Sequence, residues 1–90
     1  MADSDFDEVD GTLRAVIGDT LGLTKARVAA FDEATPLFGA LPELDSMAVA
    51  TLLTALEERF AVLIEDYDVE AEDFDSFGRL LAFTRRMTLR

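Results

Sequence analysis

The sequence predicts an all-α fold, a small four-helix bundle with three long helices and one short one. In residues 5–21, 46–60 and 76–87, apolar side chains recur at spacings of three and four, which places them on one face of a helix. Ninety residues fit one domain, so we expect a single domain over residues 1–90. Half of the residues are hydrophobic, which is enough for a modest core.

The first predicted helix spans residues 5–21. Ser4 or Asp3 can cap its start, and Gly22 is suited to ending it. Two internal glycines each cost the helix roughly 1 kcal/mol relative to alanine, so its stability must come from packing. The face expected to pack consists of Phe6, Val9, Leu13, Val16, Ile17 and Leu21.

Residues 22–44 form a long connection. Its "TKARVAAF" segment can form a turn or two of helix, but Pro36 and Pro42 prevent the later part from continuing as one helix. The connection is rich in apolar residues, which indicates a loop held against the core. These residues are Val28, Phe31, Leu37, Phe38, Leu41 and Leu44.

The second half of the chain contains two long helices separated by an acidic segment. In residues 46–60 the expected buried residues are Val49, Leu52, Leu53, Leu56 and Phe60, and in residues 76–87 they are Phe77, Leu80, Leu81, Thr84 and Met87. Residues 61–64 are apolar and are interpreted as the end of the helix and a buried crossover. Residues 65–75 hold at most a short helix, over residues 69–73.

The net charge of −11 makes binding to nucleic acid or to an anionic membrane unfavourable, because like charges repel. Seven acids and no base fall within residues 61–75, and the simplest interpretation of such a run is solvated surface. No apolar run approaches the roughly 18 residues of a membrane span, and the N-terminus does not resemble a signal peptide. We therefore expect a cytoplasmic protein.

Metal binding and catalysis find little support in the sequence. Asp66, Asp68 and Glu70 alternate as at the start of a calcium loop, but the sixth and twelfth positions hold Ala71 and Phe77 instead of glycine and glutamate. The chain has no histidine, no cysteine and no glycine-rich phosphate loop. No residues form a recognisable catalytic constellation, so we expect a non-enzyme with no built metal site.

Two serines occupy similar places in the sequence. Ser46, in "LDSM", and Ser76, in "FDSF", each follow an aspartate at a predicted helix start. Aspartate and serine are both favoured helix caps, so each serine has an ordinary structural explanation. A phosphate ester on either would lie at a helix N-terminus, which favours an anion. The tetrapeptides alone do not distinguish a cap from a modification site.

The segment "LPELDSMAVATLLTALEERFAVLIED" resembles the modification motif and second helix of the acyl carrier protein family, and "AEDFDSFGRLLAFTRR" resembles the family's third-to-fourth-helix passage. The resemblance implies that Ser46 receives 4′-phosphopantetheine from coenzyme A through a magnesium-dependent phosphopantetheinyl transferase. The arm's thiol would hold acyl or aminoacyl groups as thioesters. Ser76 would be a cap, with Phe74 packed inward.

The same resemblance implies roles for the neighbours of Ser46. Asp45 would help the transferase to recognise the site, and Met47 would be an apolar contact for partners. Those partners would be the transferase and acyl-activating ligase, synthase or acyltransferase enzymes, and the single carrier domain would act as a stand-alone monomer. Fatty acid, polyketide and nonribosomal pathways all use such carriers.

The exposed side of residues 46–60 departs from the family pattern. Carriers of fatty acid synthesis typically place several acids there, whereas this chain has alanines and threonines, with Glu57 and Glu58 only near the end. This departure favours a specialised pathway over bulk fatty acid synthesis. Ala48, Ala50 and Ala55 leave room for a cleft, although helix propensity is the preferred explanation for them. The alternative function is a helical interaction module that has the carrier fold but is not modified.

Overall fold

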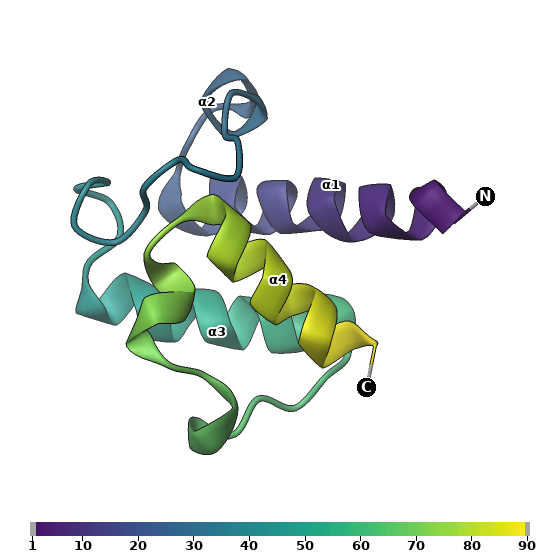
Figure 1. Cartoon of the computed structure of the whole chain (residues 1–90). Helices are drawn as coiled ribbons and strands as arrows, with labels where there is room; N and C mark the ends of the chain where they lie inside the picture. Colours follow the sequence, from purple (N-terminus) through teal and green to yellow (C-terminus); the bar gives the residue numbers. More distant parts are fainter. Residues whose placement is uncertain (1, 90) are drawn as a thin grey trace.

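The structure is a computed structural model that describes residues 2–89, with side chains described over residues 8–89 (Figure 1). Its elements are the α-helices α1 (Ala2–Leu21), α2 (Lys25–Ala29), α3 (Ser46–Phe60) and α4 (Phe77–Thr88), and the 3-10 turns η1 (Asp66–Asp68) and η2 (Ala71–Phe74). No strand forms within residues 2–89, apart from one isolated backbone bridge. The predicted helical fold with four helices is confirmed. Among the described helices, none has the length and apolarity needed to span a bilayer.

Three long helices enclose one core. α1 and α3 run in opposite directions, and α4 crosses them obliquely (Figure 1). α1 contacts α2, α3 and α4, which makes it the common support of the other helices. The side chains buried to 2% exposure or less come from all three long helices and the long connection: Leu13, Val16, Ile17, Leu37, Leu52, Leu56, Phe77, Leu80 and Phe83.

α1 begins earlier than predicted and ends where predicted. It starts at Ala2, so Asp3 and Ser4 lie within the helix and the prediction that one of them precedes it as a cap is wrong. Their side chains, like that of Phe6, lie outside the described ones. At the other end, Gly22 has φ +71° and the N–H of Leu23 donates to the carbonyl of Gly18 at 2.9 Å. Glycine adopts this left-handed conformation without steric cost, which explains the helix stop.

The connection between α1 and α3 is fixed to the start of α4 by backbone hydrogen bonds. The N–H of Phe77 donates to Thr35 at 2.8 Å, and the N–H of Gly78 donates to Glu33 at 3.1 Å. In return, the N–H of Leu37 donates to the carbonyl of Asp75 at 3.1 Å. The first N–H groups of a helix have no partner within it, so the connection supplies acceptors that α4 lacks.

The apolar residues of the connection are mostly buried, as predicted. Val28, Phe31, Leu37 and Leu44 belong to the core, and Leu41 packs against it. Phe38 is the exception, because its side chain is 48% exposed. The next residue, Gly39, has φ +91°, so the chain turns sharply directly after Phe38. The connection is therefore a packed loop with one aromatic side chain left at the surface.

The segment between α3 and α4 differs from the prediction. α3 ends at Phe60, and Ala61 takes a left-handed conformation with φ +54°. The buried crossover expected over residues 61–64 is wrong, because none of the four residues is buried and Leu63 is 70% exposed. Ile64 packs against the core but is only partly buried. The short helix expected over residues 69–73 is replaced by η1 and η2, each held by a capping box of two acidic residues.

α4 matches its predicted pattern closely. The helix begins at Phe77 instead of residue 76, because Ser76 is its cap. All five residues predicted to face inward, Phe77, Leu80, Leu81, Thr84 and Met87, are buried. Phe83 is also fully buried and was not among them. It lies three residues after Leu80, so the same helical spacing would have identified it.

Arg14 connects three helices. Its guanidinium lies 4.4 Å from the centre of the Phe77 ring, and it also donates to the carbonyl of Val28 and pairs with Asp10 on its own helix. A cation over an aromatic face is attracted by the ring's negative centre. Arg14 therefore ties α1 to α2 and to the first residue of α4.

Replacing Gly78 by alanine tests the contact between the connection and α4. An added Cβ would lie 2.7 Å from the carbonyl oxygen of Glu33, closer than real contacts allow. We expect Gly78→Ala to lower the free energy of unfolding by about 1–3 kcal/mol in a urea titration, despite alanine's higher helix propensity.

Gly11→Ala is the matched control. Its Cβ meets open space, so it should stabilise the protein by roughly 0.5–1 kcal/mol. A Gly78→Ala variant as stable as Gly11→Ala would show that the contact is absent.

Candidate functional site

Asp45 caps α3 and leaves Ser46 free. The Oδ1 atom of Asp45 accepts a hydrogen bond from the N–H of Ala48 at 2.8 Å. The Asp45 backbone is extended, as is usual for a capping residue. Ser46 is the first residue of the helix itself. Its side chain is exposed, and no hydrogen bond to another described residue engages its hydroxyl. The Ser46 hydroxyl is thus accessible and has no structural task.

Ser76 has the opposite arrangement, although its local sequence is similar. Its Oγ accepts the N–H of Arg79 at 3.2 Å, so the serine itself caps α4. Its side chain is half-buried, and its backbone forms an antiparallel bridge with Pro36. Esterifying this oxygen would disturb both the cap and the junction with the connection. The structure therefore separates two serines whose local sequences are alike.

The three residues singled out from the sequence lie together at one end of α3. Asp45, Ser46 and Met47 are all exposed, and Met47 is 81% exposed. A methionine this exposed contributes little to the free energy of folding, because folding removes little of its apolar surface from water. This end of α3 presents a carboxylate, a hydroxyl and a thioether side by side to solvent.

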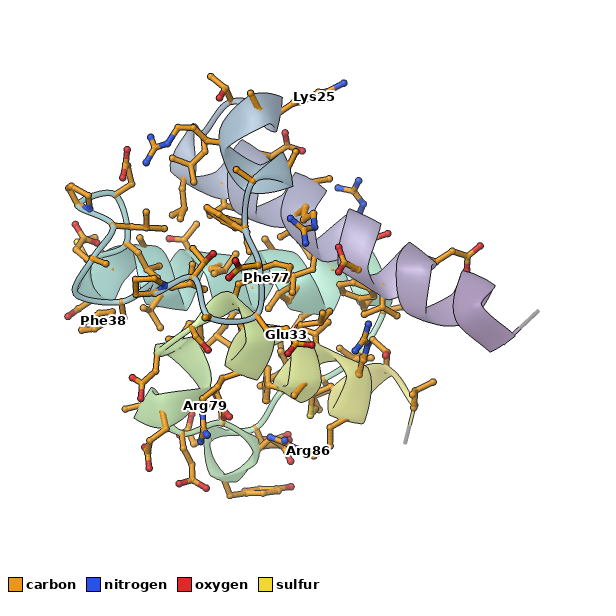
Figure 2. The ribbon with its side chains drawn as sticks, turned by 45° about the horizontal axis from the view of Figure 1, so that its top comes forward. Lys25, Glu33, Phe38, Phe77, Arg79 and Arg86 are labelled. Atoms are coloured by element: carbon orange, nitrogen blue, oxygen red, sulfur yellow. The ribbon has the colours of Figure 1, made fainter. Side chains whose placement is uncertain are left out.

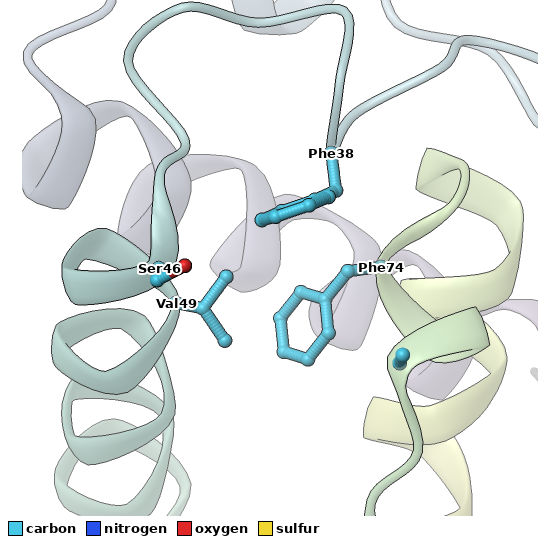
Figure 3. A pocket seen from close by; sticks show the side chains of 5 residues that line it. Phe38, Ser46, Val49 and Phe74 are labelled. Carbon is cyan, nitrogen blue, oxygen red and sulfur yellow. The ribbon is translucent and has the colours of Figure 1, made fainter.

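An apolar pocket of about 240 Å³ lies beside Ser46 (Figure 3). Ser46 and Val49 of α3 form one wall, Phe74 of η2 faces them, and Phe38 lies across the top. Ala71 completes the lining. Apart from the Ser46 hydroxyl, these side chains are apolar, so the pocket suits an apolar ligand attached at or near Ser46. The pocket is not lined by Ala48, Ala50 or Ala55, for which helix propensity is the preferred explanation.

Besides the Asp45 carboxylate, the site has one ion pair nearby and the partial charge of the helix end. Nη1 of Arg27 donates to Oε2 of Glu43 at 2.9 Å, which joins α2 to the residues just before Asp45. This hydrogen bond lowers the pKa of Glu43. The two residues are 16 positions apart, so no local sequence signal predicted the pair. The N-terminus of α3 adds partial positive charge, which favours a phosphate placed at Ser46.

The acidic residues do not build a metal site in the described part of the chain. No group of three or more acidic side chains is arranged there to hold an ion. The acids of residues 65–75 instead take part in the capping boxes of η1 and η2 or are solvated. Arg79 and Arg86, with their guanidinium groups near this segment, are visible in Figure 2. Nε of Arg79 donates to the carbonyl of Glu72, and Arg86 lies 3.8 Å from Asp73.

Comparisons with known proteins point to one family. Residues 11–83 match the family model described as "Phosphopantetheine attachment site". The chain is also similar to a solved structure, the solution NMR structure of a holo acyl carrier protein from Nitrosomonas europaea. The two share 36% sequence identity and superpose with a TM-score of 0.76, covering 87% of this chain and 92% of the other. No curated protein matched significantly.

The capping geometry predicts how three substitutions change stability. Asp45→Ala and Ser76→Ala each remove a capping oxygen and should lower the free energy of unfolding by about 1 kcal/mol. For a domain of this size that corresponds to a fall of about 4–8 °C in Tm. Ser46→Ala removes no hydrogen bond and should stay within about 0.5 kcal/mol of the unaltered protein. Thermal unfolding followed by circular dichroism measures all three. A loss for Ser46→Ala equal to that for Ser76→Ala would contradict these assignments.

Proposed function

The chain belongs to the acyl carrier protein family, and we propose that Ser46 is the residue that bears its phosphopantetheine group. As a member, the chain is a phosphopantetheine carrier, and carriers of this type are not themselves catalytic. The observation that supports Ser46 is its exposed hydroxyl, which no described residue engages. Ser76, the competing serine, uses its hydroxyl to cap α4.

The surroundings of Ser46 fit a phosphodiester and the arm attached to it. The N-terminal end of α3 offers unpaired N–H groups and a favourable dipole to the phosphate. When bound, the group supplies a flexible arm whose terminal thiol carries acyl cargo as a thioester. Asp45 keeps the helix start in place through its bond to Ala48, and we propose that its exposed face also serves transferase recognition. Met47 is proposed as an apolar contact for partners.

The pocket beside Ser46 supports an apolar cargo. Its volume of about 240 Å³ is large enough for a short acyl chain. The rings of Phe38 and Phe74 provide no polar partner for a charged acyl group. Transferring one CH₂ group from water into such a site gains about 0.8 kcal/mol. We therefore propose that the first carbons of an apolar acyl group shelter in this pocket.

The pathway is proposed from the exposed face of α3. Between Met47 and Leu56 this helix has no charged residue, which favours a specialised set of partner enzymes over bulk fatty acid synthesis. Those partners would be a transferase and an acyl-activating ligase, synthase or acyltransferase. A single carrier domain, a monomer and a cytoplasmic location remain part of this proposal.

The attachment site is tested by intact mass spectrometry after incubation with coenzyme A, Mg²⁺ and a broad-range transferase. We expect one phosphopantetheinyl adduct on the unaltered protein and on Ser76→Ala, and none on Ser46→Ala. The reverse pattern would identify Ser76 as the site. Folded protein that gains no adduct at all would favour the alternative, an unmodified interaction module.

The pocket is tested by comparing the stability of the protein with and without a hexanoyl group, which the same transferase can install from hexanoyl-coenzyme A. Sheltering of two or so CH₂ groups should raise the free energy of unfolding by about 1–2 kcal/mol. Ala71→Leu fills the pocket from its exposed rim and should abolish the gain. Ala82→Leu, at an exposed position of α4 outside the pocket lining, is the matched control and should retain it. An equal gain in both variants would place the acyl chain elsewhere.

A further inference from the structure

The short helix α2 is held firmly against the bundle, although the proposed function gives it no task. Oγ1 of Thr24 accepts a hydrogen bond from the N–H of Arg27 at 3.1 Å, which fixes the backbone of Arg27 near the start of the helix. The next residue, Val28, is buried in the core, and its carbonyl accepts a hydrogen bond from Arg14 of α1. α2 therefore gives Arg27 a fixed place from which its side chain can act on another segment.

Residues 39–44, which lead to the start of α3, have few directional contacts of their own. The backbone hydrogen bonds that Ala40, Leu41 and Leu44 donate end within the same loop. Leu41 and Leu44 pack against the core, but hydrophobic contact has no preferred direction. Packing alone therefore does not set the orientation of this segment.

One ion pair connects the segment to another helix. Within residues 8–89, the 2.9 Å bond from Nη1 of Arg27 to Oε2 of Glu43 is the one hydrogen bond that joins residues 39–44 to another helix. Oε1 of the same carboxylate is shielded from solvent, and hydrogen bonds from Arg27 and from its own backbone N–H lower the pKa of Glu43. Glu43 is therefore charged at neutral pH, and a charge-assisted hydrogen bond fixes direction as well as distance.

The ion pair acts close to the proposed attachment site. Glu43 lies two residues before Asp45, whose Oδ1 caps α3 by accepting the N–H of Ala48 at 2.8 Å. The side chains of Arg27 and Glu43 are 47% and 32% exposed, and an ion pair this exposed contributes little to global stability. Its main effect is then local, on the turn that precedes Ser46.

We propose that Arg27 and Glu43 are positioning residues for the modification of Ser46, because their ion pair holds the Asp45–Ser46 turn in the form that a phosphopantetheinyl transferase engages. This inference rests on the proposed function, since it takes Ser46 as the modified residue. Without the pair, the turn samples other orientations, and only the competent fraction can be bound. The apparent dissociation constant rises as that fraction falls. KM for the carrier should therefore rise, while kcat for the bound carrier stays the same.

The experiment measures kcat and KM for the carrier with the broad-range transferase, coenzyme A and Mg²⁺ at neutral pH. Arg27→Met and Glu43→Gln each remove the ion pair, and each should raise KM about threefold and leave kcat within about 1.5-fold. Because both variants lose the same bond, Arg27→Met/Glu43→Gln should be no worse than either single variant. Lys25→Met is the matched control. It removes one positive charge from the same helix without touching the pair, so both constants should stay unchanged.

Hydrogen exchange gives a readout that does not depend on the transferase. The amide of Ala48 reports on the cap at Asp45, and the amide of Leu80, bonded to the carbonyl of Ser76 at 3.0 Å, reports on α4. Arg27→Met should speed exchange at Ala48 about threefold and leave exchange at Leu80 unchanged. Equal acceleration at both amides would mean global destabilisation and would refute a local role for the pair.

Three kinetic results would overturn the inference. The first is a KM within about 1.5-fold of the unaltered protein in both single variants. The second is an equal rise in KM for Lys25→Met, which would mean that only net charge matters. The third is a double variant about ninefold worse than the unaltered protein, which would mean that the two residues act separately. An unaltered protein that gains no adduct on Ser46 would instead refute the proposed function. Intact mass spectrometry at long times, with full modification of each variant, excludes misfolding.

Discussion

The pairing of the long connection with the start of α4 is the constraint on which the rest of the structure depends. Carbonyls of Glu33 and Thr35 accept the N–H groups of Gly78 and Phe77, and those N–H groups would otherwise lack partners. Gly78 allows this approach because it has no Cβ. The pairing fixes the middle of the connection, and with it the position of Phe38 across the pocket, where the N–H of Phe38 donates to the carbonyl of Phe74 at 2.9 Å. It also holds Ser76 in a structural role, whereas the hydroxyl of Ser46, the other serine with a described side chain, forms no hydrogen bond to a described residue.

At the start of α3, the neighbouring residues Asp45 and Ser46 have different roles. Asp45 supplies the capping oxygen, so Ser46 can remain without a structural bond. A free hydroxyl at a helix N-terminus, next to an apolar pocket, is suited to bearing a phosphodiester-linked arm. A small helical bundle is sufficient to present such an arm at its surface.

Much of the fold could be predicted from the sequence because its information is local. The bounds of α3 and the inward face of α4 follow from helical spacing, and the stop at Gly22 follows from glycine's conformational freedom. The acidic segment could not be predicted in detail, because its two 3-10 turns lack periodicity and depend on capping boxes. The candidate site was located by resemblance at Asp45, Ser46 and Met47. Without the resemblance, the local sequences do not distinguish Ser46 from Ser76, because the difference lies in which hydroxyl caps a helix and in the bridge between Pro36 and Ser76, 40 positions apart.

We propose that the free hydroxyl of Ser46, and not the capping hydroxyl of Ser76, bears the arm. The most direct measurement is tandem mass spectrometry of the unaltered protein, isolated from its own cells and cleaved after lysine and arginine. Cleavage separates the two serines, because residues 28–59 contain only Ser46 and residues 60–79 contain only Ser76. We expect the phosphopantetheinyl ester in the fragment of residues 28–59. An ester in the fragment of residues 60–79 would contradict it.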